Sequence, residues 1–192
     1  MAYCTTAQVK AWLNIATATT TDDALLAELI AQAQQTIDAY CLRAFEASAD
    51  STRRFDAVRD VCGRTLCLDA DLCAITSITN GDGEVLATTD YVTEPRNRTP
   101  YYALRLRSDS DVSWTYSNQH ENAISIVGRW AYSTSAPADI ARACIRLTAW
   151  MYQQRDTGAD VDRVMVSNDG LLLLPQQMPR DVLALLTPYR RL

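Results

Sequence analysis

A strand-rich segment separates two long helical segments, and this order limits the folds that the chain can adopt. Residues 21–45 and 137–156 carry apolar side chains at spacings of three and four, the pattern of amphipathic helices. Residues 52–132 form short runs rich in β-branched and aromatic side chains, separated by turns. We therefore predict an α+β fold: a helical bundle core of two long helices plus short N- and C-terminal helices, with an inserted antiparallel β lobe. The expected divisions are 1–50, 51–133 and 134–192.

The helix boundaries are marked by capping residues and prolines. Thr5 and Gln8 have the spacing of a capping box before a short first helix. Thr21 or Asp22 can cap the first long helix. A final short helix is expected to open at Pro179 and to stop at Pro188. Between the second long helix and this last one, residues 156–170 are predicted to be a polar connector.

The middle segment is expected to hold about five to seven strands. The candidate runs are residues 52–57, 64–69, 74–80, 84–92, 101–107, 112–117 and 123–133. The stretch "NGDGE" at 80–84 predicts a hairpin turn, since Asn-Gly and Asp-Gly pairs favour tight turns. Residues 94–100 are expected to form a loop.

Composition points to an ordinary globular protein without strong affinity for polyanions. The chain is 48% hydrophobic, carries a formal net charge of −5 and has a pI of about 4.8. We find no secretion signal, and no apolar run reaches the roughly 18 residues that a membrane span needs. A soluble protein that is made in the cytoplasm, with no membrane partner, is therefore expected.

No pattern in the sequence indicates catalysis, a cofactor or a metal site. The six cysteines are expected to be reduced and mostly buried, and the C-x4-C-x5-C run from Cys62 is not a zinc spacing. The one histidine, His120, lies in a polar stretch and is expected to be solvated. The acidic pairs are interpreted as capping and turn residues. These pairs are Asp22 with Asp23 and Asp69 with Asp71.

Several arginines occur in close pairs. Arg105 and Arg107 are two residues apart and are expected to share one face of a strand. A solvated sheet face explains them, and so does a surface near a nucleic-acid backbone or an acidic protein groove. Nearby tyrosines and a tryptophan are compatible with both binding interpretations. The other pairs are Arg53 with Arg54, Arg96 with Arg98, and Arg190 with Arg191.

The order of these landmarks resembles the head–tail connector proteins of tailed bacteriophages, also called adaptor or head-completion proteins. The family includes the adaptors of gene transfer agents. The resemblance covers nearly the whole chain and is carried by a series of stretches. They are "VKAWLNI", "TDDALLAELIAQAQQTIDAYCLRAF", "LCLDADLCAITSITNGDGEVL", "DYVTEPRNRTP", "ISIVGRWAYSTSAPADIARACIRLTAWMYQQRD" and "MPRDVLALLTPYRRL". Ala131 stands where the family often has a glycine before Tyr-Ser.

The resemblance implies a structural role without catalysis, in a virion or phage-like particle at its head–tail junction. Such subunits form a ring with themselves, commonly of twelve, under the portal protein. The ring extends the channel for double-stranded DNA, which passes without sequence specificity, and joins the head to a stopper or tail-completion protein. A small accessory enzyme or ligand-binding module that uses the β lobe is the alternative.

The resemblance also suggests three sets of candidate residues. The tail is expected to dock on the portal and to order on binding, so deleting residues 188–192 should abolish attachment and leave the fold intact. The portal-binding candidates are Leu185, Pro188, Tyr189, Arg190, Arg191 and Leu192. The subunit-interface candidates are Arg142, Arg146, Trp150, Gln153 and Arg155. The candidates facing the DNA channel or a partner are Arg96, Arg98, Arg105 and Arg107.

Overall fold

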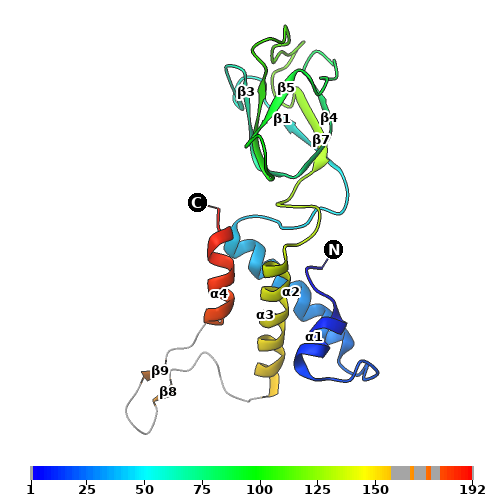
Figure 1. Ribbon diagram of the computed structural model, residues 1–192, viewed down its shortest axis with the longest axis vertical. Helices are drawn as coiled ribbons and strands as arrows, with labels where there is room; N and C mark the ends of the chain where they lie inside the picture. The colour runs from blue at the N-terminus through cyan, green and yellow to red at the C-terminus, as the bar shows by residue number, and fades with distance from the viewer. Residues whose placement is uncertain (1, 157–164, 167–171, 174–177, 192) are drawn as a thin grey trace. The chain divides into compact units, whose positions relative to one another are not determined.

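The chain folds into two compact units, a β unit and a helical unit. A computed structural model describes residues 2–156, 165–166, 172–173 and 178–191 (Figure 1). The β unit comprises residues 43–136, and the helical unit comprises residues 2–42 together with the described part of 137–192. The α+β class is confirmed. Most of the predicted connector at 156–170 lies outside the described residues, as does Leu192.

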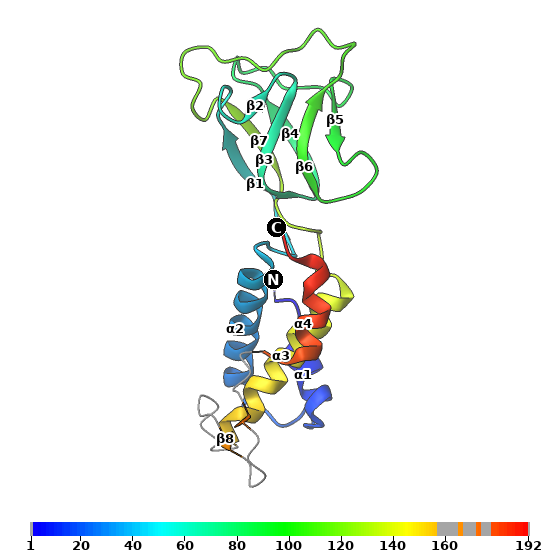
Figure 2. The ribbon, with the colours of Figure 1, turned by 90° about the vertical axis from the view of Figure 1, so that its left-hand side faces the viewer.

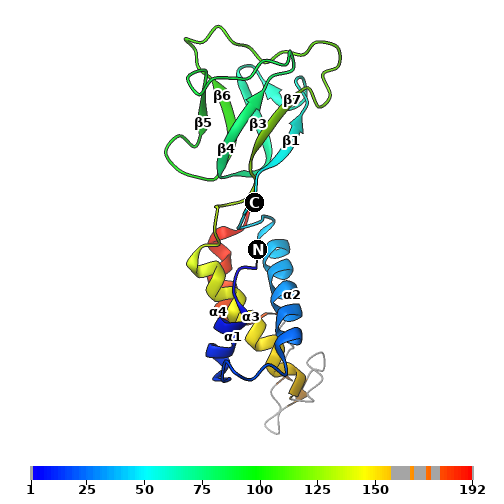
Figure 3. The ribbon, with the colours of Figure 1, turned by 90° about the vertical axis from the view of Figure 1, so that its right-hand side faces the viewer.

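The described part of the helical unit contains two helices of 19 residues and two shorter ones. Its helices are α1 (Thr6–Leu13), α2 (Asp23–Cys41), α3 (Ala138–Asp156) and α4 (Arg180–Leu186), followed by a 3₁₀ turn, η1 (Thr187–Tyr189). Helix α3 contacts each of α1, α2 and α4, and Figure 3 shows α2 alongside α1 and α3. Two short strands, β8 (Met165–Val166) and β9 (Leu172–Leu173), pair with each other.

Apolar side chains at helical spacing meet in the centre of this unit. Helix α2 buries Leu26, Ile30, Ala33, Ile37 and Cys41. Helix α3 buries Ile140, Ala143, Cys144, Leu147 and Ala149, and α4 adds Val182 and Leu186. Removing these side chains from water supplies the main stabilisation of the unit.

Polar side chains fix the start of each N-terminal helix, though not always as predicted. The capping box is confirmed, since the Gln8 backbone N–H donates to the Thr5 hydroxyl and the Gln8 side chain accepts from the Thr5 N–H. Of the two residues expected to cap α2, Asp22 occupies the N-cap position, but its carboxylate makes no capping hydrogen bond and reaches α3 instead. Lys10, which is 4% exposed, pairs with Asp23 and donates to the Thr19 carbonyl at 2.7 Å.

Two antiparallel sheets form the β unit. Residues 51–129, which are described throughout, contain seven strands, in agreement with the expected number. Strands β1 (Ser51–Phe55), β7 (Ile124–Arg129) and β4 (Ala74–Thr79) form one sheet in that order. The other sheet has the order β2 (Val61–Cys62), β3 (Thr65–Leu72), β6 (Tyr101–Leu106) and β5 (Tyr91–Glu94), as seen in Figure 2.

Side chains from both sheets share one apolar core. Leu66 and Leu104 from one sheet and Ile78 and Ile126 from the other are almost fully buried, and Trp130 completes the cluster. The inward positions alternate along β7, where Ile124, Ile126 and Gly128 are the buried members. This alternation is what a half-buried strand requires.

Two strand predictions in this unit are wrong. The run 84–92 is a strand only at its end, where β5 begins at Tyr91, and Val85 makes one isolated bridge, to Thr79. Residues 112–117 form an irregular segment with a single bridge from Tyr116 to Gly81, since the segment is held by side-chain and backbone hydrogen bonds to other loops. Strand β2 was not predicted, because two residues give no periodic signal. The turn at 80–84 is confirmed, with the Asn80 N–H donating to the Glu84 carbonyl at 2.8 Å.

Candidate partner-binding surfaces

An open pocket on the β unit brings together three of the four arginines predicted to face DNA or a partner. Arg105 lies on β6, Arg107 follows the end of β6, and Arg96 comes from the loop after β5. The pocket has a volume of about 440 Å³. It is lined by Val92, Arg96, Arg105, Leu106, Arg107, Ser108 and Asp109. Arg98 is exposed on the same loop as Arg96 but does not line the pocket.

The three guanidinium groups differ in their neighbours. Arg107 forms two parallel hydrogen bonds to Asp109, with Nε–Oδ1 and Nη2–Oδ2 distances of 3.0 Å. These bonds lower the pKa of Asp109 and raise that of Arg107. Arg96 lies 3.6 Å from a carboxylate oxygen of Glu94. Arg105 has no anionic partner in the described part of the chain, so its charge is available to an incoming anion.

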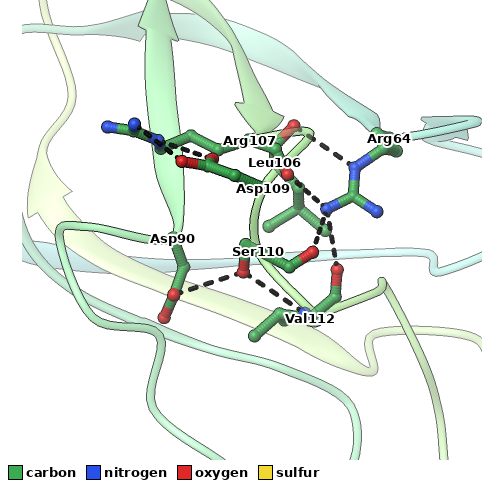
Figure 4. Close-up of polar contacts among 7 residues, drawn as sticks. All are labelled: Arg64, Asp90, Leu106, Arg107, Asp109, Ser110 and Val112. Atoms are coloured by element: carbon green, nitrogen blue, oxygen red, sulfur yellow. Dashed lines mark hydrogen bonds and ion pairs between the residues drawn. The ribbon is translucent and has the colours of Figure 1, made fainter.

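A neighbouring arginine holds the loop that carries this pocket. The Arg64 guanidinium donates to the backbone carbonyls of Leu106, Arg107, Ser110 and Val112, at 3.4, 2.5, 2.8 and 3.1 Å (Figure 4). Ser110 extends the network, because its hydroxyl donates to Asp90 and accepts from the Val112 N–H. A guanidinium has five N–H donors in a fixed geometry, so it can donate hydrogen bonds to several carbonyls at once. Sequence reasoning missed Arg64, since no local pattern reveals these contacts.

The predicted subunit-interface residues on α3 separate into two groups. Arg146 is paired within the chain, with its Nε 2.6 Å from Asp181 of α4 and its guanidinium 5.3 Å from the Trp12 ring centre. Arg155 pairs with Asp22 at 3.3 Å. Both therefore connect helices of one subunit. Arg142 and Gln153 are exposed and have no partner among the described residues, whereas Trp150 is half-buried.

Asp22 joins the start of α2 to the last turns of α3. It accepts hydrogen bonds from the Tyr152 hydroxyl at 2.5 Å and from Arg155. The Tyr152 bond and then the Arg155 bond lower the pKa of Asp22 below its ordinary value. A carboxylate with a lowered folded-state pKa adds stability above its unfolded pKa of about 3.9 and loses it as the pH falls through the folded value.

We expect Asp22→Asn to reduce the acid sensitivity of the helical unit. The variant should unfold at lower urea concentration than the wild type at pH 7. The difference between the two midpoints should narrow as the pH falls from about 4, the unfolded pKa, toward the lowered folded pKa of Asp22. Urea unfolding followed by circular dichroism at 222 nm between pH 7 and pH 3 measures this. Glu28→Gln, an exposed position on the same helix, is the control. A gap that stays constant with pH would contradict the assigned role.

The C-terminal tail lies on the helical unit in this structure. The Arg191 N–H donates to the Cys41 carbonyl at 2.9 Å, and the Tyr189 hydroxyl donates to Asp139 at 3.3 Å. The Arg190 guanidinium sits 5.6 Å from the Tyr40 ring centre. Leu185 is half-buried, while Pro188 and Arg190 are exposed. The described tail is thus already ordered, whereas the sequence suggested a peptide that orders on binding.

Two other sequence expectations need correction. His120 is not simply solvated, because its Nδ1 lies 3.0 Å from both carboxylate oxygens of Asp56. Hydrogen bonds from the Arg59 and Val58 N–H groups, and then the contact with His120, lower the pKa of Asp56. The cysteines are free, but Cys62 and Cys67 are exposed, since both side chains face solvent on the β2–β3 hairpin.

The described residues contain few features of a chemical site. No group of three or more His, Cys, Asp or Glu side chains among them is placed to hold a metal ion. None of the described helices is both long enough and apolar enough to cross a bilayer. The fold is that of a two-unit α+β protein in which some exposed arginines, such as Arg105, have no anionic partner among the described residues.

A comparison with protein families gives a match in the N-terminal part of the chain. Residues 4–65 match the model of a family described as Phage gp6-like head-tail connector protein. The resemblance to phage head–tail connector proteins is therefore confirmed. No curated protein matches the sequence.

Solved structures extend the likeness in fold to nearly the whole chain. A chain in the structure "Neck of empty GTA particle computed with C6 symmetry" is 16% identical, with a TM-score of 0.59. A chain in "Virion of native gene transfer agent (GTA) particle" is 19% identical, with a TM-score of 0.56. Each match covers 97% of this chain and 88% of the other.

Proposed function

We propose that this chain is a structural, non-catalytic subunit of the connector between the head and tail of a phage or gene transfer agent. The match of residues 4–65 to the head–tail connector family is the observation that carries this proposal. The shared fold with chains of gene transfer agent particles supports it over the remaining length. The subunit would act at the head–tail junction of the particle, after synthesis in the bacterial cytoplasm.

In this proposal the subunits form a ring under the portal protein and extend the DNA channel toward a stopper or tail-completion protein. A ring of twelve is compatible with the C6 symmetry of the related neck particle, because twelve is a multiple of six. A closed ring of identical subunits needs two different complementary faces on each subunit. The exposed side chains of Arg142 and Gln153 on α3 are candidates for one face.

The arginine pocket of the β unit would face the DNA channel or the next partner. Arg105 has no acidic side chain paired with it among the described residues, and Arg98 is exposed on the loop after β5. The overall charge of −5 limits non-specific attraction to DNA, which a channel for sliding DNA requires.

Electron microscopy of the purified protein, alone and mixed with the portal protein encoded beside it, tests the proposed function. A ring stacked coaxially on the portal is the expected result, and its symmetry would count the subunits. Monomers that never associate with the portal would contradict the proposal. That outcome would favour the alternative of a small ligand-binding module or accessory enzyme, with the 440 Å³ pocket as the place to look.

The tail provides a sharper prediction for portal binding. We expect Arg190→Glu to weaken attachment to the portal at least tenfold, roughly the effect of reversing a charge at an interface. The melting temperature should change by less than about 3 °C, because the Arg190 side chain contributes one exposed cation–π contact. Size-exclusion chromatography of portal mixtures measures binding, and a thermal scan measures stability.

Arg180→Glu is the matched control, since it reverses the charge of an exposed residue at the opposite end of α4. Deleting residues 188–192 is less informative than the single substitution. That deletion also removes the hydrogen bonds of Tyr189 and Arg191 to the helical unit and should lower its stability. Equal attachment by the Arg190→Glu and Arg180→Glu proteins would exclude Arg190 from the portal contact.

A further inference from the structure

Two cysteines that are 140 positions apart in the sequence meet inside the helical unit. The Sγ atoms of Cys4 and Cys144 are 3.4 Å apart and share a hydrogen bond. Cys4 immediately precedes Thr5, which caps α1, and Cys144 lies within α3. Cys4 is 3% exposed and Cys144 is fully buried. Both thiols are free.

The two sulfur atoms are in contact, so a small movement would bring them to bonding distance. A disulfide needs an S–S distance of about 2.05 Å, so the two sulfur atoms would have to approach by about 1.4 Å. Cys4 belongs to the short N-terminal segment before α1, where the backbone can adjust more easily than inside a long helix. The pairing is specific, because the other cysteine of the helical unit, Cys41, contacts the Leu186 carbonyl instead.

We infer that Cys4 and Cys144 form an intrachain disulfide when the protein meets a small peroxide oxidant. The Cys4 thiolate attacks one oxygen of hydrogen peroxide, the O–O bond breaks, and Cys4 becomes a sulfenic acid with loss of hydroxide. The Cys144 sulfur then attacks the Cys4 sulfur and displaces the sulfenic oxygen. The two sulfur atoms lose two electrons in total, the peroxide gains them, and the two thiol protons leave in two molecules of water.

The electrostatics of the pair assign the first step to Cys4. The hydrogen bond between Cys4 and Cys144 lowers the pKa of Cys4 and so favours its thiolate form. The same contact and burial raise the pKa of Cys144. The thiolate is the nucleophilic form of cysteine, so Cys4 reacts first and Cys144 resolves the sulfenic acid. Burial of both side chains favours an oxidant as small as peroxide.

The bond would attach the N-terminal segment covalently to α3. The closed loop would include α1, α2 and the whole β unit, and a long loop removes much conformational freedom from the unfolded chain. We therefore expect oxidation to raise the melting temperature of the protein by about 5 °C or more, and dithiothreitol to reverse the change.

Peptide mapping of the full-length protein tests the inference directly. The protein is treated with hydrogen peroxide, its remaining thiols are alkylated in denaturant, and it is digested with trypsin without reduction. The expected product is residues 1–10 joined to residues 143–146. Cys144→Ser should abolish both this peptide and the rise in melting temperature, whereas Cys41→Ser should keep the linked peptide.

The exposed thiols of Cys62 and Cys67 serve as internal references for the oxidant. Recovery of alkylated Cys4 and Cys144 at a peroxide dose that oxidises both references would overturn the inference. A cross-link from Cys4 to any cysteine other than Cys144 would do the same. The test requires no portal protein, so its outcome is independent of the proposed connector function.

Discussion

Replacing Gly128 by valine should unfold the β unit or lower its free energy of unfolding by about 3 kcal/mol or more. Gly128 lies on β7 opposite β4, at the point where the β4 register shifts between Ile75 and Ser77. A Cβ atom at this position would lie 2.3 Å from the Ala74 carbonyl oxygen and 2.9 Å from the Leu72 Cδ1. The first of these atoms is backbone, so relief requires β4 to move away from β7.

Thermal and urea unfolding, each followed by circular dichroism, measure the effect of Gly128→Val. Gly63→Asn is the control, because a Cβ at Gly63 meets no atom within 4 Å and asparagine tolerates the φ of +61° there. The control should unfold within about 1 kcal/mol of the wild type. If the Gly128→Val protein were as stable as the wild type, β4 and β7 could separate without a loss of stability. That result would contradict the tight packing described above.

Replacing Arg64 by leucine should release the loop that carries Arg107, Ser108 and Asp109. The substitution removes the hydrogen bonds to four backbone carbonyls, of which the Arg107 carbonyl keeps a second hydrogen bond, from the Ser110 N–H at 3.2 Å. We expect a loss of about 2–4 kcal/mol in the stability of the β unit, since hydrogen bonds from a charged donor are stronger than neutral ones.

Limited trypsin digestion reports on this loop, because Arg107 is a cleavage site within it. Cleavage after Arg107 should become at least tenfold faster in the Arg64→Leu protein. A tenfold change corresponds to a free energy of local opening that is lower by about 1.4 kcal/mol. Arg54→Leu, at an exposed position on β1, is the matched control. Equal cleavage rates in the two variants would show that Arg64 does not hold the loop.

The fold was largely predictable where local pattern and tertiary packing agree. The apolar spacing within α2 and α3 indicated both long helices, and the capping box of Thr5 and Gln8 marked the start of α1. The alternation along β7 and the turn at 80–84 likewise have local causes. These signals depend on neighbours within a few positions, so a single sequence contains them.

The failures have a different physical origin. Residues 112–117 are rich in β-branched and aromatic side chains, yet contacts with distant loops, including the Asn80 side-chain bond to the Ser113 carbonyl, hold them outside both sheets. The Asp22 carboxylate finds its partners about 130 positions away on α3, and Cys4 meets Cys144 across a similar separation. No local pattern encodes such pairings.

The candidate surfaces were predictable only as residue types. Arginine pairs indicated where anions could bind, and the pocket does collect Arg96, Arg105 and Arg107. The same reasoning could not tell that Arg146 and Arg155 are engaged by Asp181 and Asp22. Which arginines remain available depends on the positions of acidic side chains on other helices, and these positions are a property of the whole fold.

The division of the chain into units has a consequence for its synthesis on the ribosome. The β unit is encoded without interruption and can fold as soon as residue 136 has emerged. Helices α1 and α2 are made first, but their main packing partner, α3, is made only after the β unit. The apolar faces of these early helices therefore stay uncovered while residues 43–136 are translated. A nascent chain of this protein is thus most exposed to aggregation and to chaperone capture at its N-terminal helices.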